Sequence, residues 1–268
     1  MIKLGEIVLV GLGLHDEMGV SLRGLEEIRT ADAVFVELYT SLLSSFSLDR
    51  LERISGKRPV VLSRKDLEEK NAEAVLKAAG EGTTVLLVPG DSLIATTHVA
   101  LRLEAEKHGI RTRIVHAASI ISAAIGLSGL HNYKFGRSVT IPFPENFSET
   151  PYEVVAQNRK LGLHTLCLLD IKMEENRCLS ISEGLELLLK IETKRREKAT
   201  TMNTLAVGIA RAGSHDPTVK AGSVSELLRY DFGEPPQCLI FPGNLHFMEA
   251  EALIAFAGAP KTLQETAK

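Results

Sequence analysis

The feature that most constrains the fold is an alternation, kept from one end of the chain to the other, between short apolar runs and segments with helical periodicity. Apolar residues recur every three or four positions in an amphipathic helix, whereas a strand buried on both faces is apolar almost throughout. Strands of that kind, separated by helices, are typical of a parallel sheet covered on both sides. The sequence therefore predicts an α/β protein, with strands at Ile7–Val10, Ala33–Val36, Pro59–Leu62, Thr84–Val88, Thr112–Val115, His164–Leu169, Leu205–Ala210 and Cys238–Phe241.

Capping residues and glycines set the expected helix ends. One helix is expected to begin after Ser63, whose side chain can cap the first turn, and to end near Gly80. Capping-box spacing predicts three more helix starts, at Thr150-x-x-Glu153 with Pro151 in the first helical position, at Ser180-x-x-Glu183 and at Ser223-x-x-Glu226. Further helices are expected near Thr97–His108, Ile120–Leu130 and His246–Phe256, the last ending at Gly258.

Length and local composition predict two domains. A chain of 268 residues exceeds the usual size of one domain. Residues 131–151 are rich in proline, phenylalanine, asparagine and serine, so the domain junction is placed within residues 116–137. We expect an N-terminal α/β domain over residues 1–120 and a C-terminal α/β domain over residues 121–268.

Charge and cysteine usage exclude several classes of protein. The net charge is −3, with acids and bases mixed, which does not fit a nucleic-acid or membrane surface. The basic stretch Lys194–Lys198 is expected to end a helix, where cations offset the helix dipole. Three cysteines without metal-binding spacing suit a reducing compartment. With no apolar run near the roughly 20 residues of a membrane span and no signal-peptide pattern, a cytoplasmic location is expected.

Candidate ligand-binding segments lie at the strand ends, because ligands of open α/β sheets bind outside the carboxyl ends of the strands. Glycines, small residues and a few polar groups gather there, as expected where backbone approaches a ligand closely. Ordinary tight turns remain the alternative for the glycine-containing segments. The segments are Gly11–Leu14, Pro89–His98, His116–Ile120, Leu169–Asp170, Arg211–Ser214 and Asp231–Gln237.

Several familiar motifs are absent from the sequence. The third glycine of a dinucleotide fingerprint would fall on Asp16, and no P-loop pattern occurs. Gly126–Gly129 does not complete a nucleophile elbow. The histidines are dispersed, so no metal site is predicted, and His116 and His164 are interpreted as hydrogen-bonded structural residues.

Eight segments, in order along nearly the whole chain, resemble the diphthine synthase family of tetrapyrrole-methylase-like methyltransferases. They are Gly11–Leu14, Glu37–Ser41, Gly90–His98, His116–Ile120, Tyr133–Gly136, Leu163–Lys172, Ala210–Gly213 and Asp231–Pro236. The resemblance implies two α/β domains, the first with a parallel sheet and the second with a mixed sheet. It also implies S-adenosylmethionine (SAM) bound in a cleft between them, and a homodimer. The implied SAM contacts are Leu14, Asp91, Ile94, Ser119, Ile120, Leu169, Ala212 and Gln237.

Two residues depart from the family pattern. The family usually has proline at the position of Ser92 and often histidine at that of Gln237. Glutamine can still donate and accept hydrogen bonds, so SAM binding is expected to survive.

The resemblance implies methylation of an amino group on the 3-amino-3-carboxypropyl chain of a histidine in translation elongation factor 2, three times in archaeal-type members. An α-amino group has a pKa of about 7.7–8, so a useful fraction is neutral near pH 7 and no catalytic residue is named. Two alternatives stay open: a methylase of tetrapyrroles or other small molecules, and a binding module without catalysis.

Overall fold

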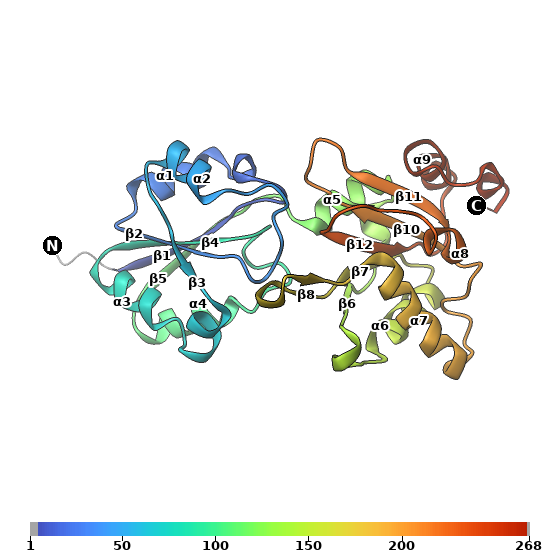
Figure 1. Ribbon diagram of the computed structural model, residues 1–268, viewed down its shortest axis with the longest axis horizontal. Coiled ribbons are helices and arrows are strands. Elements are labelled where there is room, and N and C mark those ends of the chain that lie inside the picture. Colours follow the sequence, from blue (N-terminus) through green and yellow to red (C-terminus); the bar gives the residue numbers. More distant parts are fainter. Residues whose placement is uncertain (1–4, 267–268) are drawn as a thin grey trace. The chain divides into compact units, whose positions relative to one another are not determined.

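The computed structural model describes residues 5–266, which divide into two compact units (Figure 1). The first unit runs to Ile120 and also includes Met173–Glu175. The second contains Ile121–Lys172 and resumes at Asn176. The division into an N-terminal domain of residues 1–120 and a C-terminal domain of residues 121–268 stays a prediction.

The first unit is built on a five-stranded, all-parallel sheet in the order β3-β2-β4-β1-β5. Its strands are β1 (Glu6–Gly11), β2 (Ala33–Glu37), β3 (Val60–Leu62), β4 (Thr83–Val88) and β5 (Arg111–Val115). The helices are α1 (Leu22–Thr30), α2 (Leu48–Ser55), α3 (Glu73–Glu81) and α4 (Val99–Lys107). The five strands predicted from the sequence in this region are therefore confirmed, with ends shifted by one residue.

Both faces of this sheet are buried, which explains the nearly continuous apolar strands. In β1, Ile7 and Leu9 pack into one core cluster with residues of α3 and α4, whereas Val8 and Val10 pack into another with residues of α1 and α2. Successive side chains of a strand point to opposite faces, so each face receives every second residue. Burying one such side chain contributes about 1.5–3 kcal/mol.

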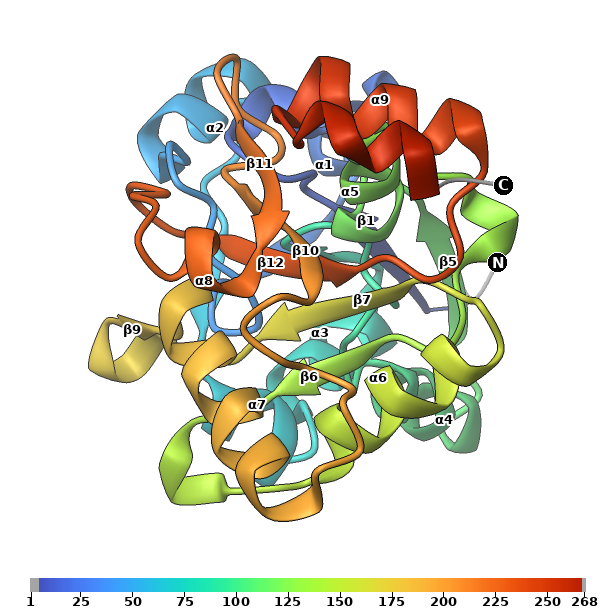
Figure 2. The same cartoon turned by 90° about the vertical axis from the view of Figure 1, so that its right-hand side faces the viewer.

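The second unit is built on a mixed sheet in the order β11-β10-β12-β7-β6, whose strands lie side by side in Figure 2. Here β6 and β7 are parallel and the other pairs are antiparallel. The strands are β6 (Val139–Ile141), β7 (Thr165–Leu169), β10 (Leu205–Ala210), β11 (Thr218–Ser223) and β12 (Gln237–Phe241). A small hairpin, β8 (Ile171–Lys172) and β9 (Arg177–Cys178), follows β7.

Helices cover both faces of the mixed sheet. One face carries α6 (Thr150–Lys160) and α7 (Ile181–Arg195), and the other carries α5 (Ile120–Ser128) and α9 (Phe247–Ala257), as both views show (Figures 1 and 2). The short α8 (Val224–Leu227) follows β11. The main core cluster contains Tyr152, Leu185 and Leu188 from the helices and Cys167 and Leu239 from the strands.

One predicted helix is interrupted. Ser63 caps the backbone amide of Asp66, as expected, but a π-helical turn (Lys65–Glu69) ends before α3 begins. Asn71 and Ala72 adopt positive φ values of 49° and 54° between the two. Ala72 is 2% exposed, so this turn places its methyl group in the core, which helical periodicity alone does not reveal.

The capping boxes at Ser180 and Ser223 are confirmed, and the one at Thr150 is wrong. Thr150 is already the first residue of α6, which puts Pro151 in the second position. The Glu153 carboxylate contacts Arg195 at 3.2 Å rather than capping the helix.

The strands β6, β8, β9 and β11 were not predicted. β6 and β11 are the edges of the mixed sheet, and β11 has the sequence TVKAGS, without an apolar run. Edge strands need less burial and often carry lysine, so periodicity does not reveal them. In the described part of the chain, no helix has the length and apolarity of a membrane span.

Candidate functional site

Five of the eight predicted SAM contacts come together at the carboxyl edge of the parallel sheet. β1 lies between β4 and β5, and all three run in the same direction. The segments that follow these strands therefore meet at one edge, which we call the first edge. It carries Leu14, Asp91, Ile94, Ser119 and Ile120.

Glycines permit a very close approach of backbone segments at the first edge. Gly13 N–H donates to Gly90 O at 3.2 Å, and Gly90 N–H donates to Gly13 O at 2.7 Å. A Cβ atom on Gly11 would lie 2.5 Å from Gly90 O and 2.7 Å from the Cβ of Ala117. Gly90 has φ +68°, which favours glycine, and a Cβ there would meet nothing within 4 Å. The glycines thus hold three strand ends together and leave Gly90 open.

Asp91 is the buried polar centre of the first edge, at 7% exposure. Its Oδ2 atom lies 2.7 Å from His116 Nδ1 and accepts a hydrogen bond from Ala117 N–H at 3.3 Å. Its Oδ1 atom accepts one longer bond, 3.4 Å, from Leu93 N–H. One carboxylate oxygen is therefore held within the protein, while the other keeps capacity to accept a ligand's hydrogen bond.

Ser92 adds to the first edge a buried hydroxyl that has no hydrogen-bond partner in the described part of the chain. Its side chain is fully buried, and its Oγ atom has no hydrogen-bond partner among the described residues. A buried hydroxyl without a partner costs free energy unless a ligand or water satisfies it. Together with the carboxylate of Asp91 and the half-exposed, apolar Ile94, the donor set fits a molecule with both polar and apolar parts.

The sequence did not single out a buried pair next to this edge, Glu37 and His98. Glu37 ends β2, and its Oε1 atom lies 3.1 Å from His98 Nε2, with both side chains almost completely buried. The backbone amides of Tyr39 and Thr40 donate to Glu37 Oε2 at 3.0 and 3.1 Å. The pair ties the segment after β2 to the segment after β4. In the sequence, both residues lie in segments of the family resemblance, Glu37–Ser41 and Gly90–His98, but nothing there indicated that they pair.

The other three predicted contacts lie at one edge of the mixed sheet, which we call the second edge. β12 runs antiparallel to β7 and β10, so the start of β12 lies beside the ends of both neighbours. Cys238 pairs with Leu168 and Gln237 pairs with Ala210. The second edge carries Leu169, Ala212 and Gln237.

Both polar atoms of the Gln237 side chain form hydrogen bonds with backbone groups. Its Oε1 atom accepts a hydrogen bond from Ile181 N–H, the first residue of α7, at 2.9 Å, and its Nε2 donates to Gly233 O at 2.7 Å. Arg211 fixes the same loop by donating to Phe232 O and Glu234 O, both at 2.9 Å. The glutamine therefore shapes the loop before β12.

Residues 5–266 show no metal-binding cluster, and two of the three cysteines are unreactive. No group of three histidine, cysteine, aspartate or glutamate side chains suits a metal ion there. Burial raises the pKa of the Cys238 thiol to about 12 and raises that of Cys167 as well, so neither is a nucleophile at neutral pH.

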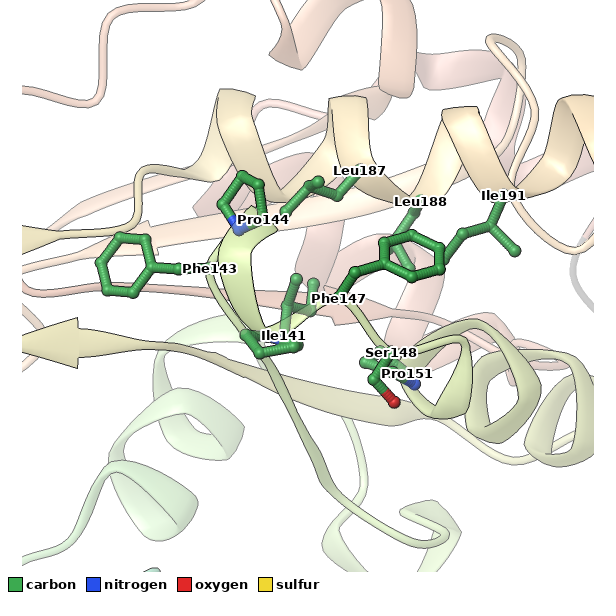
Figure 3. Close-up of a pocket in the computed structure, with 10 residues that line it drawn as sticks. Ile141, Phe143, Pro144, Phe147, Ser148, Pro151, Leu187, Leu188 and Ile191 are labelled. Carbon is green, nitrogen blue, oxygen red and sulfur yellow. The ribbon is translucent and has the colours of Figure 1, made fainter.

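The second unit also has a small apolar pocket (Figure 3). Phe143 and Phe147 from the segment after β6 line it, with Leu187, Leu188 and Ile191 from α7. It contains none of the eight predicted SAM contacts.

Comparison with known proteins identifies the class. Residues 6–228 match the family model of the tetrapyrrole (corrin/porphyrin) methylases. This match covers well over half of the chain, so the chain belongs to the tetrapyrrole methylase family and is a methyltransferase.

Individual relatives show to which branch of the tetrapyrrole methylases the chain belongs. The chain is 48% identical to a diphthine synthase of Methanocella arvoryzae, covering 94% of this chain and 98% of the relative. It is 46% identical to one of Methanosarcina mazei, covering 97% and 98%. A crystal structure of a diphthine synthase superposes with a TM-score of 0.89 at 44% identity, covering 98% of this chain and all of that one. Within the tetrapyrrole methylases, the chain is a member of the diphthine synthase family.

Proposed function

We propose that this methyltransferase takes methyl groups from SAM and adds them to the amino group of the 3-amino-3-carboxypropyl-histidine of translation elongation factor 2, a step of diphthamide biosynthesis. One observation carries the proposal: identity of 48% with a diphthine synthase over nearly the full length of both chains. The match covers 94% of this chain and 98% of the relative. We further propose three methyl transfers, a homodimer and a cytoplasmic location, as the resemblance and the archaeal relatives suggest.

The residues of the first edge fit SAM chemically. Bound SAM supplies an electrophilic methyl group on a positively charged sulfonium. The Oδ1 atom of Asp91 would accept a hydrogen bond from a polar group of the cofactor, and the Ser92 hydroxyl would donate or accept another. Leu14, Ile94 and Ile120 would contribute apolar contacts.

The residues of the second edge are proposed to complete cofactor binding. Leu169 and Ala212 would offer an apolar side chain and backbone groups. Gln237 would act by fixing the loop that precedes β12, since both ends of its amide already bind backbone. This role differs from the direct contact implied by the family resemblance.

In the chemical step, the main contribution of the protein is to align the substrate amine with the methyl group. Methyl transfer is an in-line displacement, and holding amine and methyl group in line can supply much of the rate enhancement. The backbone hydrogen bonds between Gly13 and Gly90 fix two of the segments that carry proposed contacts, which favours such alignment.

The proposal is tested by incubating the protein with SAM and elongation factor 2 that carries the unmethylated aminocarboxypropyl-histidine. Mass spectrometry of the modified peptide counts the methyl groups added. We expect stepwise gain to three. No gain, with SAM binding verified by calorimetry, would leave the methyltransferase class intact and refute the protein substrate, favouring a small-molecule substrate instead.

A further inference from the structure

The geometry of the first edge points to a proton acceptor that the family comparison does not assign. We infer that His116 takes the proton from the substrate ammonium before each methyl transfer, with Asp91 orienting its imidazole. The inference rests on the proposed function, because it concerns an amine substrate at the same edge.

The first observation is the tautomer that Asp91 imposes. Asp91 Oδ2 lies 2.7 Å from His116 Nδ1, and a carboxylate can only accept a hydrogen bond. Nδ1 of the neutral imidazole therefore carries the hydrogen, which leaves the lone pair on Nε2. The same pairing of a buried carboxylate with histidine orients the general base in other enzymes and stabilises the imidazolium that forms.

The second observation is the contrast in burial within the pair. The Asp91 side chain is 9% exposed and further fixed by the amide of Ala117, whereas the His116 side chain is 74% exposed. Among the described residues, the His116 ring has one hydrogen bond and ion pair, that of Nδ1 with Asp91, which leaves Nε2 unpaired. The basic nitrogen is thus accessible at the edge where the cofactor contacts gather.

The third observation is the position of His116 in the chain. It follows directly after β5 and precedes Ser119 and Ile120, two of the proposed SAM contacts. A substrate amine aligned with the methyl group of SAM must approach this same edge. The imidazole is therefore in the right place as well as in the right tautomer.

The substrate ammonium gives one proton to Nε2 and becomes a neutral amine, and His116 becomes imidazolium. The amine lone pair forms a bond to the methyl carbon, and the carbon–sulfur bond breaks with its electron pair going to sulfur. The exposed imidazolium returns its proton to solvent. Three transfers to one nitrogen need three such deprotonations, and an exposed imidazole can serve each of them.

The test is His116→Gln, measured by single-turnover methyl transfer to modified elongation factor 2 between pH 6.5 and 9.5. Glutamine can still donate a hydrogen bond to Asp91, so we expect SAM affinity within about threefold of the parent. We expect the rate at pH 7 to fall several-fold, up to about tenfold, because an amine of pKa about 7.7–8 is only roughly one-tenth neutral at that pH without a base. The deficit should shrink above pH 8, where the substrate amine loses its proton unaided. Added imidazole should partly restore His116→Ala.

A matched control is His108→Gln. His108 is also an exposed histidine beside a carboxylate, that of Glu104 at 3.7 Å, but it lies at the end of α4 and away from the first edge. Its rate should equal that of the parent at every pH.

Four results would overturn the inference, and the last of them would also refute the proposed function. A His116→Gln rate within threefold of the parent at pH 7 would show that no base is needed there. An equal deficit at all pH values, or a tenfold loss of SAM affinity, would show that His116 only holds Asp91 in place. In these cases the parent still methylates elongation factor 2. A parent that binds SAM but adds no methyl group would instead refute the proposed function, and the inference with it.

Discussion

At the scale of single residues, the two oxygens of the Asp91 carboxylate have different hydrogen-bond partners. Asp91 Oδ2 pairs with His116 and the amide of Ala117, whereas Oδ1 accepts one longer hydrogen bond, from the amide of Leu93. The sequence predicted Asp91 as a contact because it follows a strand and belongs to a family motif. It could not reveal the partner, because His116 lies 25 positions away.

We predict that Asp91→Ala lowers SAM affinity about tenfold or more. A hydrogen bond to a charged group contributes about 1.5–3 kcal/mol, and each 1.4 kcal/mol is a factor of ten. Isothermal titration calorimetry measures the affinity, and circular dichroism checks the fold. Asp49→Ala is the control, because Asp49 is an exposed residue of α2 paired with Arg58. Unchanged affinity in a folded Asp91→Ala protein would remove Asp91 from the cofactor site.

His164 illustrates the opposite outcome for a residue-scale prediction. It was interpreted as a hydrogen-bonded structural histidine, and the structure confirms this. Its ring is fully buried, with Nε2 2.9 Å from Glu249 Oε1 and Nδ1 accepting from Gly243 N–H at 2.9 Å. His116 has a carboxylate partner too but stays exposed, and burial is the property that sequence alone did not distinguish.

At the scale of elements, the helix starts show how well a local sequence pattern predicts a helix cap. The same four-residue spacing gave a real capping box at Ser180 and none at Thr150. The difference is one of context: Glu183 returns to the amide of Ser180 at 2.8 Å, whereas Glu153 contacts Arg195 of α7. Tertiary partners therefore compete with local caps for the same side chain.

This contrast gives a paired prediction. Ser180→Ala should lower the free energy of unfolding by about 1 kcal/mol, because the amide of Glu183 loses its acceptor. Thr150→Ala should change it by less than about 0.5 kcal/mol, since Thr150 makes no cap bond and alanine favours helix. Urea denaturation followed by circular dichroism measures both. Equal losses would mean that the cap at Ser180 does not stabilise α7.

At the scale of the molecule, a buried ionic cluster links distant segments of the second unit. Glu249 of α9 is fully buried and receives hydrogen bonds from Lys134, His164 and the backbone amides of His131 and His246. Burial by itself raises the pKa of Glu249, but these hydrogen bonds outweigh it and lower the pKa to about 2. Burial also lowers the pKa of His164.

Both shifts predict a loss of stability in acid. Glu249 ionises more easily folded than unfolded, so its contribution is complete above pH of about 4.5 and is lost as the pH falls toward 2. His164 stays neutral in the folded state, so its contribution declines as the pH falls below about 6.5. The free energy of unfolding should therefore decrease steadily from pH 7 to pH 3.

Glu249→Gln tests the cluster directly. It should cost about 3 kcal/mol at pH 7, because Lys134 loses its buried counter-charge, and less at pH 3. Urea denaturation at both values, followed by circular dichroism because the chain has no tryptophan, measures the difference. Glu251→Gln, an exposed neighbour on α9, should have no such effect. A loss for Glu249→Gln that is the same at both pH values would contradict the electrostatic explanation.

The sequence by itself determined the α/β class, the five strands of the parallel sheet and the segments that carry the proposed contacts. These follow from local physics: a strand buried on both faces must be apolar throughout, and a parallel sheet brings the carboxyl ends of its strands to one edge. The tertiary structure alone decided the partners. The order of the strands places His116 next to Asp91, and antiparallel pairing places Gln237 next to Ala210. The packing of α6 against α7 lets Glu153 contact Arg195, so Glu153 does not form the expected cap. Such pairings join residues far apart in the chain, so no local pattern encodes them.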